Sequence, residues 1–567
     1  MNSNWFLHNK RNSIKEVSQK LGLKPLTSVI LCNREIYEED NIKKMLSSDI
    51  NDINDASLLP DVDKATMVLN EYINNRKRIR IVGDYDIDGV CATYILFDAI
   101  RKLGADISFD IPDRISDGYG INISIIDKAI NDKIDLIITC DNGIAAGEQI
   151  SYAKKNGIEV IVTDHHDIAS LPKDAIAIVD PKRKDVEKIY PFSEICGAVV
   201  AWKFMMRYYE LYRNDKKYII DNYLEFAMLA TIGDIMPLVN ENHIIAKIGL
   251  KKIIHSQNAG LKKMLDITEI DYNNKGVSTY HIGFIIGPLI NAAGRMDKAT
   301  TALNLFLSND EREMDEISEV LKKLNIERKK MTEEGIKLAI DDIELNYKNN
   351  KVILVFVEGI GEQVAGIVAG RIKDKYNKPT IVLTDTLNAD EVKASCRSIE
   401  AYDLFEALSA HKDMFLKFGG HKMAAGFSML KADIDKLRNL LNEECNLKEE
   451  DFIPKIYIDA EFPFYNFNLD LISEIDRLEP YGQGFQRPIF ATKGVRCSIK
   501  NVYGADNNVM HLILNKDSKL SKAVFFGNYE LIKNRLDSSD VIDVVYSPSI
   551  NEFRGLKSVD IKLIEYR

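Results

Sequence analysis

Short apolar segments alternate with amphipathic helical segments from about residue 61 onward, and this alternation restricts the possible folds more than any other feature. The apolar segments are residues 79–82, 107–111, 136–140 and 160–162, and a helical pattern at 65–69 precedes the first. Such short, mainly apolar runs are typical of parallel strands that are buried on both faces. The sequence therefore predicts an α/β fold whose mainly parallel sheet is covered by helices on both faces.

The chain has 567 residues, which is more than one hydrophobic core supports, so roughly three to five domains are expected. The fold class is α/β, with two α/β lobes joined by a long helix and a C-terminal β-barrel of the oligonucleotide-binding (OB) kind. The predicted boundaries are a lead-in at 1–60, the first lobe with a helical extension at 61–305, the connecting helix at 306–347, the second lobe at 348–447 and the barrel at 452–567.

The connecting helix is predicted from Ile317, Leu324, Met331 and Leu338, which recur every seven residues. A coiled coil with a partner helix is the alternative, although the repeat is short for one. The lead-in has a polar and helical pattern, and residues 5–7 (Trp-Phe-Leu) are expected to anchor it on a later domain.

The second lobe is expected to contain strands and to close with a glycine-rich loop at residues 418–426. Short strand-like segments joined by turns follow, with one helical interruption, and this pattern predicts a small β-barrel. The strand segments predicted for the barrel are 456–462, 488–502, 509–514, 523–526 and 541–546.

The composition excludes several classes of protein. No apolar run is long enough to span a membrane and no signal sequence is visible, so a cytoplasmic protein is expected. The seven cysteines form no C-x-x-C pair, which argues against a disulfide framework and a structural zinc site. A net charge of -11 confines any nucleic-acid binding to a local groove.

Acidic and imidazole side chains follow the predicted strands, where an α/β sheet places its ligands. If the first strand continues in extended form, its three carboxylates lie on one side. The candidate ligands are Asp84, Asp86 and Asp88 after the first strand, Asp141 after the third, His165 and His166 after the fourth, and Asp234 farther along the chain.

Each of these motifs has a structural alternative. The Asp-x-Asp-x-Asp-Gly pattern also opens calcium loops, but Ile95 stands where the bidentate glutamate is required, so calcium is not favoured. Asp141 alone is typical of a turn, Asp234 of a helix cap, and paired histidines of a surface loop. Their joint occurrence after successive buried strands is what favours a common site.

Carboxylates clustered in a partly buried cleft repel one another, and bound divalent metal is the simplest way to relieve this. Oxygen ligands with one or two imidazoles suit Mn²⁺ or Mg²⁺. Two such ions could share one carboxylate, activate water and stabilise a phosphoryl transition state. Hydrolysis of a phosphoester is therefore the leading reaction.

The chain resembles the DHH phosphoesterases, and within them the single-strand-specific 5′-to-3′ exonucleases. The resemblance covers nearly the whole length. Its first part consists of four motifs in order, at residues 83–89, 140–143, 163–166 and 233–234. The motifs that carry the exonuclease assignment lie at 287–296, 395–398, 419–421 and 478–482.

The resemblance implies a role for each matching residue. Asp86, Asp88, Asp141, His165 and Asp234 would bind two metal ions, with Asp141 bridging them and Asp84 close by. His166 would face the scissile phosphate and Asp164 would orient it. Arg295, Ser395 and Arg397 would hold the terminal 5′-phosphate, and Gly419, Gly420 and His421 would form a loop near the substrate. An ordinary ion pair between domains is the alternative role for Arg397.

Three places depart from the family pattern. Leu289 stands where a basic residue is usual, Phe485 where an asparagine is usual, and residues 358–363 diverge. We therefore expect the details of strand binding to differ more from the family than the metal site does.

The expected function is removal of 5′-mononucleotides from single-stranded DNA in repair and recombination, with Mn²⁺ or Mg²⁺ as cofactor. Single-stranded DNA is the expected partner, together with a single-strand-binding protein or a helicase, without membrane association and as a monomer. The alternatives are a DHH phosphodiesterase for short oligoribonucleotides or cyclic dinucleotides, and a non-catalytic replication-associated scaffold.

Overall fold

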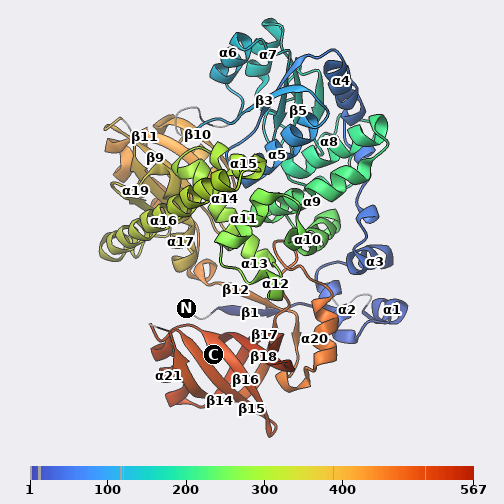
Figure 1. The fold of residues 1–567 in the computed structure, drawn as a ribbon. Coiled ribbons are helices and arrows are strands. Elements are labelled where there is room, and N and C mark those ends of the chain that lie inside the picture. Colours follow the sequence, from blue (N-terminus) through green and yellow to red (C-terminus); the bar gives the residue numbers. More distant parts are fainter. Residues whose placement is uncertain (1–2, 10–13, 115–117, 119, 387, 505) are drawn as a thin grey trace.

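The first lobe is built on a parallel five-stranded sheet in a computed structural model that describes residues 3–9, 14–114, 118, 120–386, 388–504 and 506–567 (Figure 1). Every strand pairing in this sheet is parallel, as the apolar segments predict. In sheet order the strands are β3 (Asp106–Asp110), β2 (Arg78–Val82), β4 (Leu136–Cys140), β5 (Glu159–Thr163) and β6 (Ala177–Val179).

Helices cover both faces of this sheet because successive strand residues point to opposite sides. Ile81 packs into the core on one face, and the next residue, Val82, packs into the core on the other. The helices are α5 (Ile87–Arg101), α8 (Gly197–Tyr212) and α9 (Lys216–Gly233) on the first face, and α6 (Ile123–Asn131) and α7 (Gly147–Lys155) on the second.

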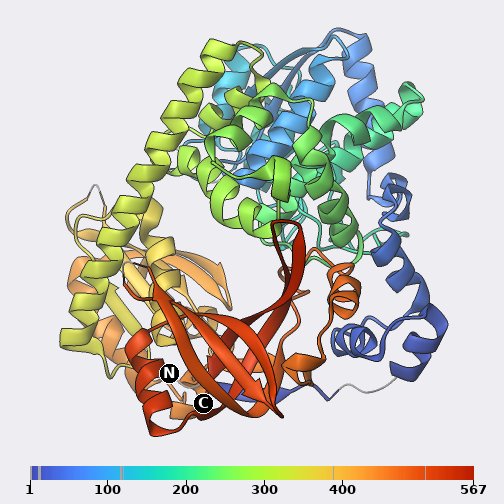
Figure 2. The same ribbon diagram turned by 60° about the horizontal axis from the view of Figure 1, so that its bottom comes forward.

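A single long helix, α16 (Glu311–Asp342), joins the first lobe to the second, as predicted (Figure 2). Its buried positions differ from the predicted seven-residue stripe, because Leu338 is half exposed whereas Leu321 and Ala339 are fully buried. The helix packs first on the core of one lobe and then on that of the other, so its buried face changes along its length. These contacts within the chain occupy the face that the coiled-coil alternative would need.

The second lobe contains a mixed five-stranded sheet, and its glycine-rich segment is part of that sheet. Gly419, Gly420 and His421 lie in an edge strand that forms a hairpin with its neighbour, so the prediction of a loop is wrong. In sheet order the strands are β10 (Phe415–His421), β11 (Ala424–Leu430), β9 (Glu391–Arg397), β8 (Thr380–Asp385) and β7 (Ile353–Phe356), and α17 (Glu362–Tyr376) packs beside them.

A barrel forms the C-terminal part, because its first long strand pairs with both the second and the fourth. The sequence prediction missed the last strand, which forms a hairpin with the one before it. The strands are β14 (Phe490–Tyr503), β15 (Val509–Lys516), β16 (Lys519–Phe526), β17 (Val541–Phe553) and β18 (Leu556–Tyr566).

The N-terminal segment is anchored on the barrel through a short strand, β1 (Asn4–Leu7), which pairs in parallel with β12 (Lys455–Ile458). The indole of Trp5 donates to Glu565 Oε2 at 2.9 Å, which confirms the anchor, but Phe6 and Leu7 are exposed. The helices α1 (Ile14–Leu21), α2 (Pro25–Asn33) and α3 (Glu39–Ser47) share one apolar core with the barrel.

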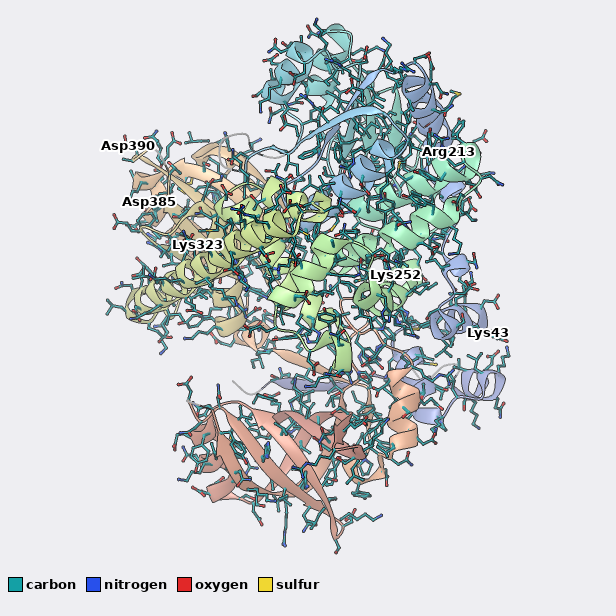
Figure 3. The ribbon with its side chains drawn as sticks, viewed as in Figure 1. Lys43, Arg213, Lys252, Lys323, Asp385 and Asp390 are labelled. Atoms are coloured by element: carbon teal, nitrogen blue, oxygen red, sulfur yellow. The ribbon has the colours of Figure 1, made fainter. Side chains whose placement is uncertain are left out.

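Charged side chains of both signs lie at the outer edges of the molecule, as Figure 3 shows for Lys43, Arg213 and Asp390. Within the described ranges, no helix is both long enough and apolar enough to cross a membrane.

Candidate metal centre

The three aspartates after β2 lie in a tight turn into a helix, which contradicts the predicted extended segment. Asp86 is the N-cap of α5, and its Oδ1 accepts hydrogen bonds from the amides of Asp88 at 2.9 Å and Gly89 at 3.1 Å. A Cβ atom at Gly89 would lie 2.4 Å from the carbonyl oxygen of Asp84, so glycine is required there. Asp88 therefore lies in the first turn of a helix and not on an extended segment.

Asp88 is held by the start of α8. Its two carboxylate oxygens accept from the amides of Gly197 and Ala198, each at 2.7 Å. Amides at a helix N-terminus are natural partners for a carboxylate. The site is thus tied to a helix more than 100 positions later in the chain.

Asp141 follows β4 directly and has a left-handed backbone, with φ 61°. Its amide donates to the carbonyl of Thr163 at 3.1 Å. Gly197 lies so close that a Cβ there would be 2.7 Å from the Cβ of Asp141. A strained conformation kept in place by neighbouring structure is common at functional sites.

Asp164 orients both the backbone and a ring of the histidine pair. Its Oδ1 accepts from the amide of His165 at 2.7 Å and lies 2.8 Å from Nδ1 of His166, while Oδ2 accepts from the amide of Ile144 at 2.9 Å. Burial alone would raise its pKa, but the contact with His166 keeps the pKa of Asp164 lowered. Asp164 is therefore in contact with the ring that the resemblance implies it orients.

The imidazole of His165 lies among three of the aspartates. Its Nε2 lies 3.1 Å from Asp141 Oδ1, 3.5 Å from Asp88 Oδ2 and 4.0 Å from Asp234 Oδ2. Asp234, at the C-cap of α9, completes the set from a different segment of the chain.

All seven side chains predicted to lie at the metal site converge there. Within each of three groups, the potential ligand atoms lie within 4.8 Å of one another. Asp141 and His165 each belong to two of the groups, and of these two only the carboxylate of Asp141 has two ligand oxygens that two ions could share. The groups are Asp84–Asp86–Asp141, Asp88–His165–Asp234 and Asp141–His165–His166.

The charges fit a divalent cation. Burial, followed by repulsion from neighbouring carboxylates, raises the pKa of Asp84, Asp141 and Asp234, in the last case to about 8. Within the described structure, the buried Asp84 Oδ1 has no hydrogen-bond partner. A set of carboxylate oxygens with imidazole nitrogen is suited to Mn²⁺ or Mg²⁺.

The second lobe presents its predicted phosphate ligands at the interface between the lobes. Ser395 and Arg397 are two residues apart on β9, so they point to the same side. A Cβ at Gly366 of α17 would lie 3.1 Å from Arg397 Nη2 and 3.6 Å from Ser395 Oγ, so glycine leaves room for both. From the first lobe, Arg295 donates from Nη1 to the carbonyl of Gln363 at 2.7 Å.

Sequence reasoning missed Arg114, which lies in the same region. Its guanidinium carbon is 4.9 Å from the centre of the Tyr85 ring, and it lines a small cavity of about 70 Å³ with Ser395. Burial first, and then the charge of Arg114, lower the pKa of Arg295 to about 10. Arg114 follows a strand of the first lobe without any motif, so no local signal marked it.

Gly420 is required by the sheet, because a Cβ there would lie 2.5 Å from Cα of Ala425 in the paired strand, whereas a Cβ at Gly419 would meet no atom within 4 Å. The hydrogen bond with Lys182 is the main cause of the lowered pKa of Asp167, the residue after His166, and His421 makes a smaller contribution to it, so His421 lies near this edge of the first lobe. Of the unusual residues, Leu289 and Phe485 are both buried in apolar cores.

Family models match three parts of the chain: the DHH family N-terminal domain at residues 78–231, the DHHA1 domain at 349–447 and the RecJ OB domain at 458–565. These matches cover both lobes and the barrel.

Two curated relatives are similar over almost the whole chain. The single-stranded-DNA-specific exonuclease RecJ of Bacillus subtilis is 32% identical over 98% of this chain and 69% of its own length. The protein of the same name from Haemophilus influenzae is 30% identical over 98% of each chain.

Two solved structures are also similar. RecJ of Thermus thermophilus in complex with Mn²⁺ has a TM-score of 0.84 at 24% identity, over 100% of this chain and 79% of that one, which shows a common fold. An exonuclease RecJ bound to manganese has a TM-score of 0.59 at 29% identity, over 69% of this chain and 96% of that one.

Proposed function

Because the chain belongs to the RecJ family of single-stranded-DNA-specific exonucleases, we propose that it is a metal-dependent exonuclease that removes 5′-mononucleotides from single-stranded DNA in repair and recombination. The observation that carries this proposal is the convergence of carboxylates and imidazoles around Asp141, which belongs to two potential ligand groups. A centre of this kind opposite a cluster of arginines suits a phosphodiester substrate.

Two Mn²⁺ or Mg²⁺ ions are the proposed cofactors. Asp84, Asp86, Asp88, His165 and Asp234 would hold them, with Asp141 between the two. Such ions, when bound, lower the pKa of water and stabilise the negative charge that develops on the phosphoryl group. The buried turn before α5 and the start of α8 keep the carboxylates in place before substrate binds.

His166 is the proposed contact to the scissile phosphate. Its Nδ1 contacts Asp164 Oδ1, which orients the ring, and Nε2 is the atom proposed to donate a hydrogen bond to a phosphate oxygen. Burial opposes protonation, but Asp164 raises the pKa of His166 to about 9 in the structure without ions. In the reaction, an oxygen from water replaces the 3′-oxygen of the departing nucleotide at phosphorus.

The polarity of the reaction is proposed to come from the interface between the two lobes. Arg295, Ser395 and Arg397, together with Arg114, would bind the terminal 5′-phosphate one nucleotide away from the metal centre. A guanidinium can hold two phosphate oxygens at once, which favours arginine for this task. His421, Gly419 and Gly420 on β10 would line the opposite side of the strand.

The proposal is tested with a single-stranded 20-mer labelled at either end and incubated with Mn²⁺, Mg²⁺ or EDTA. We expect the 5′ label to leave at once as a mononucleotide and the 3′-labelled strand to shorten progressively, in both cases only with metal. Release of the 3′ label first, or of internal fragments, would contradict it.

A barrel deletion is unsuitable for separating this proposal from a hydrolase of short oligoribonucleotides, because α1–α3 share their core with the barrel. The full chain should instead be compared on DNA strands of increasing length and on RNA dinucleotides. Preference for the dinucleotides would favour the alternative. Retention of all the expected ligand residues argues against a non-catalytic scaffold.

We further propose that the protein acts as a cytoplasmic monomer and that a single-strand-binding protein or a helicase supplies its substrate. The barrel matches an OB domain, a fold that can hold the single-stranded DNA that has not yet been digested. Light scattering of the purified chain, alone and with such a protein, tests both statements.

A further inference from the structure

Three guanidinium groups gather at the interface between the lobes. They belong to Arg114 of the first lobe, Arg295 of α14 (Gly287–Met296) and Arg397 of β9. Among the described residues they form no ion pair: Arg114 lies over the ring of Tyr85, and the two others donate to main-chain carbonyl groups. Burial is the main cause of the lowered pKa of Arg397, and the charge of Arg114 adds to it. Such a partly buried cluster of like charges suits an anion.

A fourth cation lies farther along the same strand. Lys393, Ser395 and Arg397 alternate on β9, so their side chains point to one side of the sheet. Lys393 and Ser395 both line the small cavity that Arg114 also lines. The row of side chains therefore continues roughly 7 Å past Ser395, away from Arg397.

Unlike the three arginines, Lys393 is paired with a carboxylate. Its Nζ lies 2.8 Å from Oε2 of Glu362, in the first turn of α17. The side chain of Glu362 is 22% exposed, and Glu362 lines the same cavity. A carboxylate there places negative charge next to side chains that are otherwise suited to a phosphate, and like charges repel.

The diverging stretch at residues 358–363 holds Glu362 in this place. The amide of Gly359 donates to Asp385 Oδ2 at 2.9 Å. Asp385, labelled in Figure 3, is the last residue of β8, which pairs with β9. The hydroxyl of Thr384 on the same strand donates to a carbonyl of this stretch. The start of α17 is therefore tied to the sheet beside β9.

The cavity limits how many phosphoryl groups the terminal site can take. Its volume of about 70 Å³ is small beside the roughly 300–1,000 Å³ of ordinary ligand pockets. Thr384 also lines it, but its hydroxyl already donates to the carbonyl of Ile360. A second phosphoryl group joined to the terminal one would have to enter this space. It would lie against the carboxylate of Glu362, and the cation beside it would already be neutralised.

We infer that Glu362 is a specificity-determining residue that restricts the terminal site to one phosphoryl group. Strands with a 5′-monophosphate are accepted, whereas strands with a 5′-diphosphate or 5′-triphosphate are poor substrates. A hydrolytic cut can leave a monophosphate at the new 5′ end, and a strand begun from a nucleoside triphosphate keeps its triphosphate. The protein would thus act on cut strands and spare newly begun ones. This inference rests on the proposed exonuclease function and adds a limit to its substrates.

The test uses single strands of one sequence that carry a 3′ label and end in a 5′-monophosphate, 5′-diphosphate or 5′-triphosphate. With Mn²⁺, the wild type should have a kcat/KM for the monophosphate strand at least about 5-fold above that for the diphosphate strand. One unit charge about 4 Å away has this effect even in bulk water. Glu362→Gln keeps the shape and removes the charge, so it should raise the ratio of diphosphate to monophosphate kcat/KM by at least about 5-fold.

Two further variants check that charge is the cause. Lys393→Gln leaves the carboxylate of Glu362 without its partner, so it should lower the same ratio, in the direction opposite to Glu362→Gln. Glu358→Gln is the matched control, because Glu358 is an exposed carboxylate of the same diverging stretch and lies outside the described lining of the cavity. It should keep the ratio of the wild type.

A wild type that digests all three strands equally well would overturn the inference. An unchanged ratio in Glu362→Gln would overturn it too and leave Glu362 with the role of an ordinary ion pair. The same strands are also compared by binding in EDTA, where no hydrolysis occurs. If the wild type binds the monophosphate strand more tightly, Glu362→Gln loses this difference, and no strand is digested with Mn²⁺, the inference on Glu362 stands and the proposed exonuclease function is refuted.

Discussion

Arg295 of α14 donates a hydrogen bond to the carbonyl oxygen of Gln363 at the start of α17, 2.7 Å away. The two lobes are therefore joined at the guanidinium group proposed to bind the terminal phosphate. Arg397 lies on the second lobe, in the same region and close to Gly366 of α17. The proposed phosphate site thus depends on both lobes holding their relative position.

Arg397→Gln should reduce the preference for a 5′-phosphorylated strand over a 5′-hydroxyl strand about 10- to 100-fold, because a hydrogen bond to a charged group contributes about 1.5–3 kcal/mol. The rates on the two strands are compared under single-turnover conditions. Arg371→Gln, on the exposed side of α17, is the control and should keep the preference. Equal loss on both strands would argue against a phosphate contact.

Asp141→Asn should reduce exonuclease activity more than about 100-fold, because the proposed bridge between the ions is lost. In EDTA, the melting temperature should stay the same or rise, since burial and like charges raise the pKa of Asp141 and the amide removes that repulsion. Asp106→Asn, at the opposite end of the same sheet, should behave like the wild type in both measurements. An active Asp141→Asn variant would refute the bridge.

His165 and His166 should respond differently to substitution. A ligand concentration of about 100 Kd stabilises a folded protein by about 2.7 kcal/mol, so Mn²⁺ should raise the melting temperature of the wild type. His165→Ala should lose most of this increase, because Nε2 of His165 lies among the carboxylates. His166→Ala should keep it and still be inactive. The reverse pattern would exchange the two proposed roles.

His243 should make the protein sensitive to acid. Its Nε2 donates to the carbonyl of Leu478 at 2.9 Å, and burial lowers its pKa from 6.5 to about 4. The unfolded chain therefore binds a proton between these values that the folded chain does not, and stability falls as pH falls from about 6.5 to 4. The full effect is about 3 kcal/mol.

His243→Gln removes this titration and should flatten the pH dependence of the unfolding free energy over that interval. Denaturant unfolding at several pH values measures the difference between variant and wild type. His255→Gln, in the turn that follows the C-terminal end of α10 (Asn240–Lys252), is the control for loss of a histidine. Parallel curves for His243→Gln and wild type would show that His243 is not the group responsible.

The strands of the first lobe and the candidate metal ligands at their ends could be predicted from sequence, because both are local properties. A run such as residues 136–140 has no charged position and no alternation of apolar and polar residues, so it is expected to be buried on both faces. Asp141 and His165 follow such runs directly, and parallel strands bring their ends to one edge.

The relative positions within the site depend on contacts that no local pattern contains. Asp88 is directed by amides of α8, and Asp141 is held against Gly197. Arg114 reaches the phosphate region only because the two lobes meet there. The alternating positions of the three aspartates predicted that they lie on one side of an extended segment. In the structure the chain turns into α5 at Asp86, so they do not.

By itself, the sequence determined the buried strands and the types of side chain at their ends. Both properties depend on a few consecutive residues: an apolar run is buried on both faces, and the residue types that follow it decide which ligands they can bind. Only the tertiary structure decided which of these side chains share a position and which rings remain exposed. Tyr280 and Phe284 have an ordinary apolar spacing for a buried helix, yet both face solvent. The physical reason is that exposure depends on what the rest of the chain covers.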